Sequence, residues 1–305
     1  MKHASLTESD IDLYSLHLLR MVAKYRGFTA ASQACGLSQS AMTRHVQSIE
    51  SRLGIKVFER TTRTVKITEP GAVLLRETEA IPGILDSAMR RIREDYLGAR
   101  REIRIGISHE LALAHVVGIF HAQQKLQPDV RIVVSPLDDA ALMRKVGHAG
   151  LDLGILTAPA ITPENVTVTH RMVDQFSIIV PHTADVAGVC DSIAQFKKWA
   201  SSQSWLLPPE KSRSRQLMDE WACENRMELR PVMELENFDL MLQLVSMNMG
   251  VALIPRRAYA TFRRKVTVQV LSPPVELSRQ MIVIAPKHGK PPEHVSRFVD
   301  GILFS

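Results

Sequence analysis

Residues 39–47 carry a run of polar side chains that could contact nucleic acid. They fall on one face of an expected helix, at Gln39, Ser40, Thr43, Arg44 and Gln47. Amide, hydroxyl and guanidinium groups form hydrogen bonds with base edges and phosphates, and a single helix fits into the DNA major groove. An ordinary solvent-facing amphipathic helix carries similar residues, so this face does not decide the function by itself.

A second set of polar side chains follows expected strands later in the chain. These loops offer, in chain order, Ser108, His109, Glu110, Asp138, Asp139, Thr157 and Pro208. Small ligands bind at such strand ends and helix starts in α/β folds. Ser108 could donate to a carboxylate, but the acidic residues disfavour a bare anion. We therefore expect a neutral, zwitterionic or cationic ligand, unless the acids only cap helices. His109 is expected to be a solvated loop residue.

Common catalytic signatures are missing from the sequence. It contains no Walker-type phosphate loop, dinucleotide fingerprint, His-Glu-x-x-His or Gly-x-Ser-x-Gly. The 3 cysteines and the scattered histidines show no metal-ligand spacing. An enzyme fused to a DNA-binding domain, such as a biotin-protein ligase, is the alternative, but the glycine- and arginine-rich nucleotide loop of that ligase is absent. We expect no catalytic residue, no metal and no cofactor.

Two short helices around a tight turn are expected to position the polar face of residues 39–47. Thr29 can cap the first helix, Gly36 can take a positive φ after its end, and Ser38 can cap the second. The apolar side of the second helix consists of Ala41, Met42, Val46, Ile49 and Leu53. A preceding helix begins after Asp12, and the small residues Ala30, Ala31 and Ala34 allow it to pack closely.

A basic hairpin is expected to follow these helices. Residues 56–58 and 64–68 have strand patterns, and their connection carries Arg60 and Arg63. Such a hairpin beside a recognition helix is a wing that touches DNA backbone or minor groove. The DNA backbone would then be held in position by Thr29, Arg60, Arg63 and Lys66. The whole-chain net charge of +6 permits nucleic-acid binding but does not require it.

These residues together resemble the DNA-binding region of LysR-type transcriptional regulators. The resemblance runs without a gap over residues 12–71 and is carried by Phe28-Thr-x-Ala, Ser38-Gln-x-Ala, Arg44, Ile49-Glu, Leu53-Gly, Val57-Phe-Glu-Arg and Thr68-Glu-x-Gly. The chain departs from the family at Ser32, Cys35 and Ser40, where Ala, Leu and Pro are usual. Cys35 still suits a buried apolar position, and Ser40 loses only a preferred first-turn residue. The resemblance implies DNA binding.

Residues 70–98 are expected to form a linker helix. Pro70 suits its start, and an apolar stripe runs through Ala72, Leu75, Ile81, Leu85, Ala88 and Ile92. Charged residues surround the stripe, among them Arg90 and Glu94. In the family this helix pairs two protomers, which places two recognition helices on two half-sites. Pro82-Gly83 predicts a kink or break, because proline inside a helix removes a hydrogen bond.

From residue 101 onward strands alternate with helices, which indicates a parallel α/β sheet. We expect two lobes joined by crossing strands: lobe I at residues 101–168 and 270–305, and lobe II at residues 169–269. A cleft between them would hold a small ligand. This part resembles the effector-binding half of the same family, which is similar to periplasmic binding proteins. The similar phrases are Arg104-Ile-Gly-Ile-Ser, Pro128-Asp-Val, Leu151-Asp-Leu-Gly-Ile and Gly250-Val-Ala-Leu-Ile-Pro. Asn248 replaces a glycine there, but asparagine tolerates positive φ.

The expected protein is thus a winged helix-turn-helix (residues 10–69), a linker helix (70–98) and a two-lobed α/β effector domain (101–305). The resemblance implies a regulator that binds promoter DNA and a small-molecule effector. It also implies a homodimer through the linker helix and a homotetramer through the effector domains, with RNA polymerase as a further candidate partner. A purely architectural DNA binder is the other alternative, but bending DNA requires no ligand domain.

The location of the protein is expected to be the cytoplasm. No apolar run is long enough to span a membrane, and the first residues lack the apolar core of a signal peptide. The odd number of cysteines, Cys35, Cys190 and Cys223, fits a reducing compartment. A redox switch between Cys190 and Cys223 is disfavoured, because they fall in different expected elements.

Overall fold

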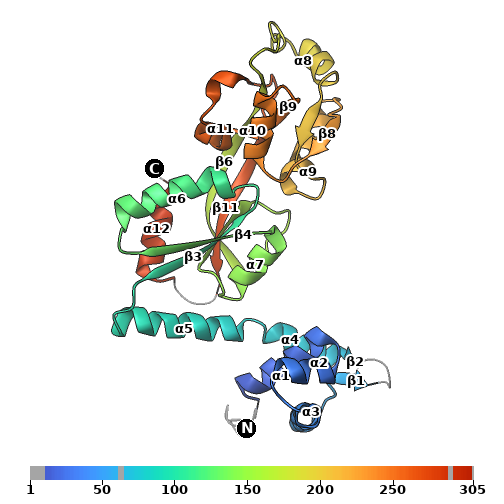
Figure 1. Cartoon of the computed structure of the whole chain (residues 1–305), viewed down its shortest axis with the longest axis vertical. Coiled ribbons are helices and arrows are strands. Elements are labelled where there is room, and N and C mark those ends of the chain that lie inside the picture. Colours follow the sequence, from blue (N-terminus) through green and yellow to red (C-terminus); the bar gives the residue numbers. More distant parts are fainter. Residues whose placement is uncertain (1–10, 61–64, 288–290, 304–305) are drawn as a thin grey trace, which may run out of the picture. The chain divides into compact units, whose positions relative to one another are not determined.

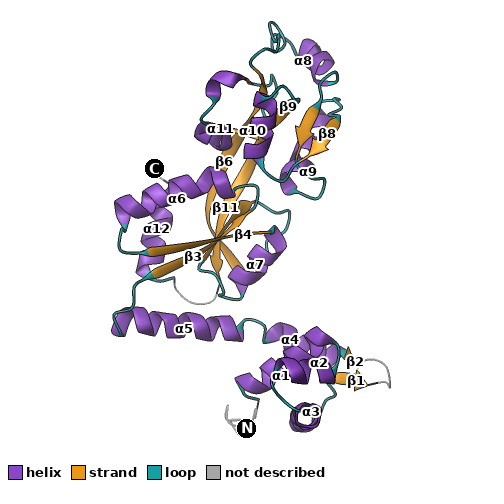
Figure 2. Cartoon of the chain, viewed as in Figure 1, coloured by secondary structure: helices purple, strands orange, loops and turns teal. Residues whose placement is uncertain are grey.

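The computed structural model describes residues 11–60, 65–287 and 291–303 (Figure 1). The chain forms two compact units, which divide between Asp86 and Ser87, within helix α5 (Ile81–Tyr96). Helices dominate the first unit, whereas strands and helices alternate in the second (Figure 2). Among the described residues, no helix combines the length and the apolar character needed to cross a membrane.

Three helices and a short hairpin precede the linker in the first unit. They are α1 (Leu13–Tyr25), α2 (Phe28–Ala34), α3 (Gln39–Leu53), β1 (Phe58–Arg60) and β2 (Val65–Ile67). The helices pack around fully buried side chains, which include Leu18, Leu19, Ala31, Met42 and Val46. Of the small residues expected between helices, only Ala31 is buried, whereas Ala30 and Ala34 are exposed. Asp12 caps α1 as predicted, because its Oδ1 accepts a hydrogen bond from the Ser15 amide at 2.7 Å.

The expected linker helix consists of two helices, α4 (Glu69–Glu77) and α5. Pro70 lies in the first turn of α4, as predicted. The predicted interruption is present, but residues 78–80 form it and Pro82 lies just after it, in the first turn of α5. Proline is tolerated there because the first N–H groups of a helix have no partner within the helix. Pro82 therefore begins a helix rather than bending one.

Gly71 allows α4 to lie against the hairpin. A Cβ atom at this position would approach the Val57 carbonyl oxygen to 2.4 Å, so no larger residue fits without a backbone shift. Thr68 holds the same junction: its Oγ1 accepts from the Gly71 amide at 3.1 Å and donates to the Lys56 carbonyl at 2.6 Å. The Thr68-Glu-x-Gly sequence is thus the joint between the hairpin and α4.

Lobe I of the second unit has a parallel sheet at its centre. Its strands are β3 (Glu102–Ser108), β4 (Arg131–Leu137) and β5 (Leu153–Thr157), in the order β4-β3-β5. Its helices are α6 (Ala112–Leu126), α7 (Asp139–Gly147) and α12 (Glu293–Leu303). The isoleucines of β3 are fully buried, which explains the apolar strand pattern: Ile103, Ile105 and Ile107.

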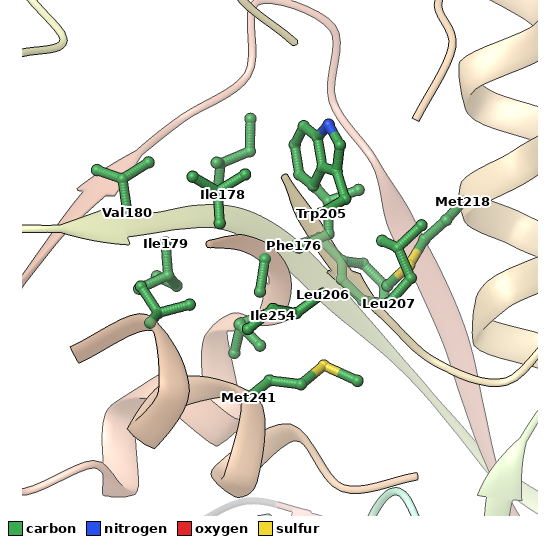
Figure 3. Packing of buried hydrophobic residues seen from close by; sticks show 14 of the residues in the cluster. Phe176, Ile178, Ile179, Val180, Trp205, Leu206, Leu207, Met218, Met241 and Ile254 are labelled. Atoms are coloured by element: carbon green, nitrogen blue, oxygen red, sulfur yellow. The ribbon is translucent and has the colours of Figure 1, made fainter. Parts of the chain in front are cut away.

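Lobe II contains shorter strands and more helices. They are α8 (Ile193–Ala200), β7 (Trp205–Leu207), α9 (Arg213–Glu224), β8 (Pro231–Glu234), α10 (Phe238–Ser246), β9 (Val251–Pro255), α11 (Arg256–Thr261), a 3-10 turn (Lys265–Thr267) and β10 (Val268–Leu271). Figure 3 shows its core, in which Trp205 and Phe176 lie among aliphatic side chains. The Trp205 indole donates to the Ala200 carbonyl at 2.8 Å, so its one polar atom is satisfied.

Two long antiparallel strands join the lobes: β6 (Val166–Pro181) and β11 (Ser278–Pro286). β6 pairs with β11 over residues 166–175 and with β9 and β10 over residues 176–181. All nine strands described in this unit therefore belong to one sheet. Because β10 pairs with the lobe II part of β6, the chain returns to lobe I along β11, later than the expected boundary at residue 270.

The sequence patterns locate most elements of the second unit to within a few residues. The sequence pattern predicts a strand only at residues 176–180, which is the last part of β6, and it predicts no helix at the position of α11. Asn248 has a φ of 63°, as expected for the residue that replaces glycine before β9. Its Oδ1 also accepts from the Thr183 hydroxyl at 3.0 Å.

Candidate nucleic-acid interface and ligand pocket

The turn before α3 fixes where the candidate DNA-contacting helix begins. Gly36 has a φ of 66°, and the Ser38 hydroxyl caps α3 by accepting from the Ala41 amide at 3.1 Å. Both features agree with the sequence prediction. The predicted cap at Thr29 is wrong, because the residue at the cap position is Gly27 and α2 begins at Phe28, two residues earlier than a cap at Thr29 implies. Thr29 is an exposed residue inside the first turn of α2.

The two faces of α3 differ as the sequence predicts. Met42, Val46 and Ile49 are buried against the other helices. The opposite face presents exposed polar side chains, namely Gln39, Ser40, Arg44 and Gln47, with Thr43 half-buried at its edge. Ser40 is held locally, since its hydroxyl lies 3.0 Å from that of Ser38. Within the first unit, this exposed face of α3 is therefore accessible to a DNA duplex.

Glu50 joins α3 to the hairpin, a role that the sequence did not reveal. Its side chain is 3% exposed, and its Oε1 accepts from the amides of Val57 and Phe58 at 2.9 and 3.1 Å. Its Oε2 forms an ion pair with Lys56 Nζ at 3.0 Å. Burial alone would raise the pKa of Glu50, but these donors outweigh it and lower the pKa below 4.5. The carboxylate thus remains charged and fixes the hairpin to α3.

The hairpin presents one predicted backbone contact within the described residues. Lys66 is exposed on β2, directly opposite Glu59 on β1. Arg60 ends β1, but its side chain is outside the described part of the structure, as is all of Arg63. The described part of the predicted wing is therefore its two strands, on which Lys66 is exposed.

A cavity of about 420 Å³ lies between the two lobes of the second unit. Six of the seven predicted ligand residues line it: Ser108, His109, Glu110, Asp138, Asp139 and Pro208. The seventh, Thr157, is buried and donates its hydroxyl hydrogen to Glu110 Oε1 at 2.7 Å. His109 is exposed, in agreement with its interpretation as a solvated loop residue. Strand ends of one sheet thus gather residues that are distant in the sequence.

The acidic residues of this pocket have different roles. Asp138 caps α7, because its Oδ1 accepts from the Ala141 amide at 2.8 Å. The capping interpretation is therefore right for Asp138, whereas Asp139 is the first residue of α7 and Glu110 is bound from below by Thr157. Glu236 from lobe II also lines the pocket. The sequence favours Glu210 instead, because it follows Pro208-Pro209 in a loop after a strand, but Glu210 is not among the lining residues.

A buried arginine beneath the pocket was missed by sequence reasoning. Arg279 on β11 is 1% exposed and lies directly opposite Asp174 on β6, with which it pairs at 3.0 Å. The same guanidinium donates to Glu110 Oε1 at 3.3 Å and to Ser214 Oγ at 3.0 Å. It also lies 5.3 Å from the ring centroids of Phe176 and Phe238. Arg279 therefore links both crossing strands, lobe I and lobe II.

Asp139 has an unusual affinity for protons. Burial, followed by the nearby carboxylates of Glu110 and Asp138, raises its pKa from 3.8 to about 6, against the weaker effects of His109 and Arg279. Because the folded state binds this proton more tightly than the unfolded chain, the stabilisation is complete below pH 3.8. It is lost as the pH rises through about 6.

Replacing Asp139 with Asn should remove this pH dependence. We expect the thermal midpoint of the variant to exceed that of the wild type at pH 8, and the difference to shrink toward pH 4.5, where the wild-type carboxyl holds its proton. Thermal unfolding followed by circular dichroism at several pH values measures both midpoints. Parallel pH curves for the two proteins would contradict the raised pKa.

The three cysteines are free thiols. Burial, with a smaller contribution from Asp191, raises the pKa of Cys190, which reduces the fraction of reactive thiolate. In the described ranges no group of three His, Cys, Asp or Glu side chains is placed to hold a metal ion.

Comparison with known proteins identifies similar sequences for both units. A family model of bacterial regulatory helix-turn-helix proteins, lysR family, matches residues 13–72, and a model of the LysR substrate binding domain matches residues 97–303. A probable RuBisCO transcriptional regulator of Phaeodactylum tricornutum is 22% identical over 287 residues, which is 90% of each chain. An uncharacterized HTH-type transcriptional regulator of Shigella flexneri, YfeR, is 24% identical over 90% of this chain and 89% of its own.

Solved structures show the same fold. A full-length OxyR variant of Pseudomonas aeruginosa has a TM-score of 0.67 and 15% identity, with 96% of this chain and 95% of that chain covered. CbnR in complex with its target DNA has a TM-score of 0.64 and 15% identity, with 96% and 99% covered.

Proposed function

The chain belongs to the LysR family of DNA-binding transcriptional regulators, and we propose that it reads promoter DNA through α3 and answers to an effector bound between the two lobes. The observation that carries the proposal is the exposed polar face of α3, whose other face is buried in the first unit. Gln39, Ser40, Thr43, Arg44 and Gln47 would read base edges there. Ser38, Thr29, Arg60, Arg63 and Lys66 would hold the DNA backbone.

Replacing Arg44 or Lys66 with Ala should change DNA binding in different ways. A bidentate arginine contact with a base supplies about 1–3 kcal/mol of discrimination, so Arg44→Ala should bring specific binding toward the level of random DNA. Lys66→Ala should weaken specific and random duplexes equally and reduce the salt dependence, d log K/d log[salt], by about 0.9. Competition binding on the upstream region of its own gene, at several salt concentrations, separates the two outcomes.

Lys24→Ala is the charge-matched control, because Lys24 is exposed in the last turn of α1 and belongs to neither the α3 face nor the hairpin. It should leave both specificity and salt dependence unchanged. Equal loss on specific and random DNA for Arg44→Ala would contradict base reading by Arg44. A wild-type protein without preference for its upstream region over scrambled duplex, with or without metabolites, would overturn the proposed function.

The effector is proposed to bind in the pocket lined by Ser108, Glu110 and Asp139, with Thr157 supporting Glu110 from below. Support comes from the way in which both lobes and both crossing strands meet at this position. A ligand that contacts both lobes can change their angle, which is how effector binding would reach the rest of the protein. The domain boundaries remain a prediction. Only the start of the second segment of lobe I differs from the expected residue 270, because we now place it at β11.

Dimerisation through the linker is a further part of the proposal. α5 carries a row of apolar side chains that the described chain leaves 37–47% exposed: Ile81, Ile84, Leu85, Met89 and Ile92. Their spacing places them on one side of the helix, so a second copy could cover them. Phe120 of α6 is also 57% exposed and offers an apolar position for a tetramer contact.

Leu85→Glu should weaken the dimer, because a carboxylate would have to be buried without a partner. A cost of about 1.4 kcal/mol or more corresponds to a tenfold or larger increase in the dissociation constant. Sedimentation velocity over a concentration series measures it, with Arg91→Gln on the same helix as the control. An unchanged dissociation constant for Leu85→Glu would exclude this face from the interface.

We also propose that the protein acts in the cytoplasm and that RNA polymerase is a further partner. A promoter-binding regulator acts where the chromosome lies, and RNA polymerase is the protein that meets it at a promoter. The family consists of transcription regulators, so we assign no catalytic activity to the pocket.

A further inference from the structure

The walls of the pocket between the lobes carry opposite charges. Glu110, Asp138 and Asp139 line it from lobe I. Lys211 and Arg213 line it from lobe II, together with one acid, Glu236. A ligand that fills this cavity therefore meets carboxylates at one end and cations at the other.

The lobe I wall has more negative than positive charge. Beneath it, Arg279 is shared between Asp174 and Glu110, so one guanidinium faces two carboxylates before the acids of the wall are considered. His115 adds no positive charge at neutral pH, since burial and the nearby Arg279 and Arg257 lower its pKa to about 4. A group with a positive charge would balance this wall, and a second anion would be repelled.

Two buried oxygen atoms of this wall have no hydrogen-bond partner among the described residues. They are Ser108 Oγ, in a residue 2% exposed, and Glu110 Oε2. Buried polar atoms are nearly always satisfied, and leaving one unpaired costs free energy. Both residues line the ligand-sized cavity, so two unpaired oxygens in its wall point to a ligand. Both oxygens can accept hydrogen bonds, and an ammonium group offers three donors.

The lobe II wall suits an anionic group. Lys211 is exposed, and it forms no ion pair or hydrogen bond in the described part of the chain. Arg213, in contrast, is engaged by Glu220 at 3.2 Å and Gln216 at 3.3 Å. Lys211 precedes α9, a helix of 12 residues capped by Ser212, whose first amides have no partner within the helix. The Arg215 amide is already bound to the Ser212 hydroxyl. The unengaged lysine and the other first amides of the helix favour a carboxylate or similar anion.

We propose that the effector is a small zwitterion, whose ammonium group binds Glu110 and Ser108 and whose anionic group binds on the Lys211 side. This proposal rests on the proposed function, because it takes the pocket to be the effector site. The cavity of about 420 Å³ limits the size of the ligand. Amino acids and zwitterions of similar dimensions are the compounds of this class that we expect to bind.

The test is a binding panel built from matched triads on the full-length protein. Each triad contains an amino acid, the amine without its carboxylate and the acid without its amino group, and the panel covers the twenty standard amino acids, their ω-amino analogues and dicarboxylic acids. Thermal shift ranks the compounds, and calorimetry measures the affinity of the hits. We expect at least one zwitterion to bind tenfold or more tightly than both of its truncated partners.

Variants locate the binding. Asp139→Asn and Glu110→Gln should weaken the zwitterion about tenfold or more, with less effect on the acid partner. Lys211→Gln should weaken the zwitterion and the acid but not the amine. Asp129→Asn, an exposed acid outside the pocket, is the matched control and should change none of these affinities. If Glu110→Gln fails to fold, Asp139→Asn still tests the same wall.

Several outcomes would overturn the zwitterion. They are strongest binding by dicarboxylic acids, absence of any ammonium-containing binder in the panel, and binding that none of the pocket variants weakens. The proposed function is judged separately by promoter competition. A zwitterion that binds the pocket without altering DNA binding would support the ligand class but reject its role as the effector. Promoter binding that responds only to dicarboxylates would support effector control but reject the zwitterion.

Discussion

Replacing Arg279 with Met is expected to destabilise the second unit by about 3–5 kcal/mol, because it leaves a buried carboxylate without its partner. Asp174 is 1% exposed, and its Oδ2 is bound by both Nε and Nη2 of Arg279. Glu110 and Ser214 would lose a donor at the same time. Methionine fills similar space between the phenylalanine rings, so the loss isolates charge and hydrogen bonding from packing.

Chemical denaturation of the full-length protein measures the effect, with Arg171→Met as the matched control. Arg171 lies exposed on β6, and its Nη1 donates to Gln280 at 2.8 Å, so its removal should cost less than about 0.5 kcal/mol. Arg279→Lys should be intermediate, because lysine keeps the charge but not the planar fork. Combining Arg279→Met with Asp174→Asn should recover part of the loss. Equal stability of Arg279→Met and Arg171→Met would contradict a bridging role.

Local sequence signals located the turn before α3 and the ends of the lobe I strands. Gly36 and Ser38 act within four residues of their partners, so propensity and capping chemistry are sufficient to place them. The pocket residues Ser108, Asp138 and Thr157 were found because each one ends or follows an apolar strand. Parallel strands bring such ends together without any further information.

Long-range pairing set the limit of the sequence prediction. Arg279 and Asp174 are separated by 105 positions, and no local pattern relates them. The first part of β6 was missed because polar side chains such as Thr169 and Arg171 interrupt the apolar pattern. Phe176 and the apolar run Ile178-Ile179-Val180 gave the stronger strand signal.

Charged residues on amphipathic helices were also misinterpreted. Arg90 was expected beside the apolar stripe of the linker, but its side chain is 10% exposed and pairs with Asp152 at 2.6 Å within the second unit. Glu94 on the next turn accepts from the Glu102 amide at 3.1 Å. Helical periodicity separates polar from apolar positions, but it cannot tell a solvated charge from one that a distant strand buries. The role of Glu50 on α3 was missed for the same reason in the first unit.

Replacing Glu50 with Ala should destabilise the first unit by about 3 kcal/mol, since it removes a charged acceptor from two buried backbone amides. Val57 and Phe58 would keep buried N–H groups without partners, and Lys56 would lose its ion pair. The hairpin would no longer be held against α3, so DNA affinity should fall even though no residue of the α3 surface has changed. Glu50→Gln should be milder, because the amide oxygen can still accept from both N–H groups.

Hydrogen exchange of the Val57 and Phe58 amides, together with thermal unfolding and DNA binding, tests this role, with exposed Glu59→Gln as the control. The folded-state pKa of Glu50 lies below 4.5, so its stabilisation is present above that pH and is lost as the pH falls through the lowered value. The gap between wild type and Glu50→Ala should therefore narrow in acid. Faster exchange in Glu50→Ala but not in Glu59→Gln is the expected result. Unchanged protection of the two amides in Glu50→Ala would show that the hairpin is held by its apolar contacts alone.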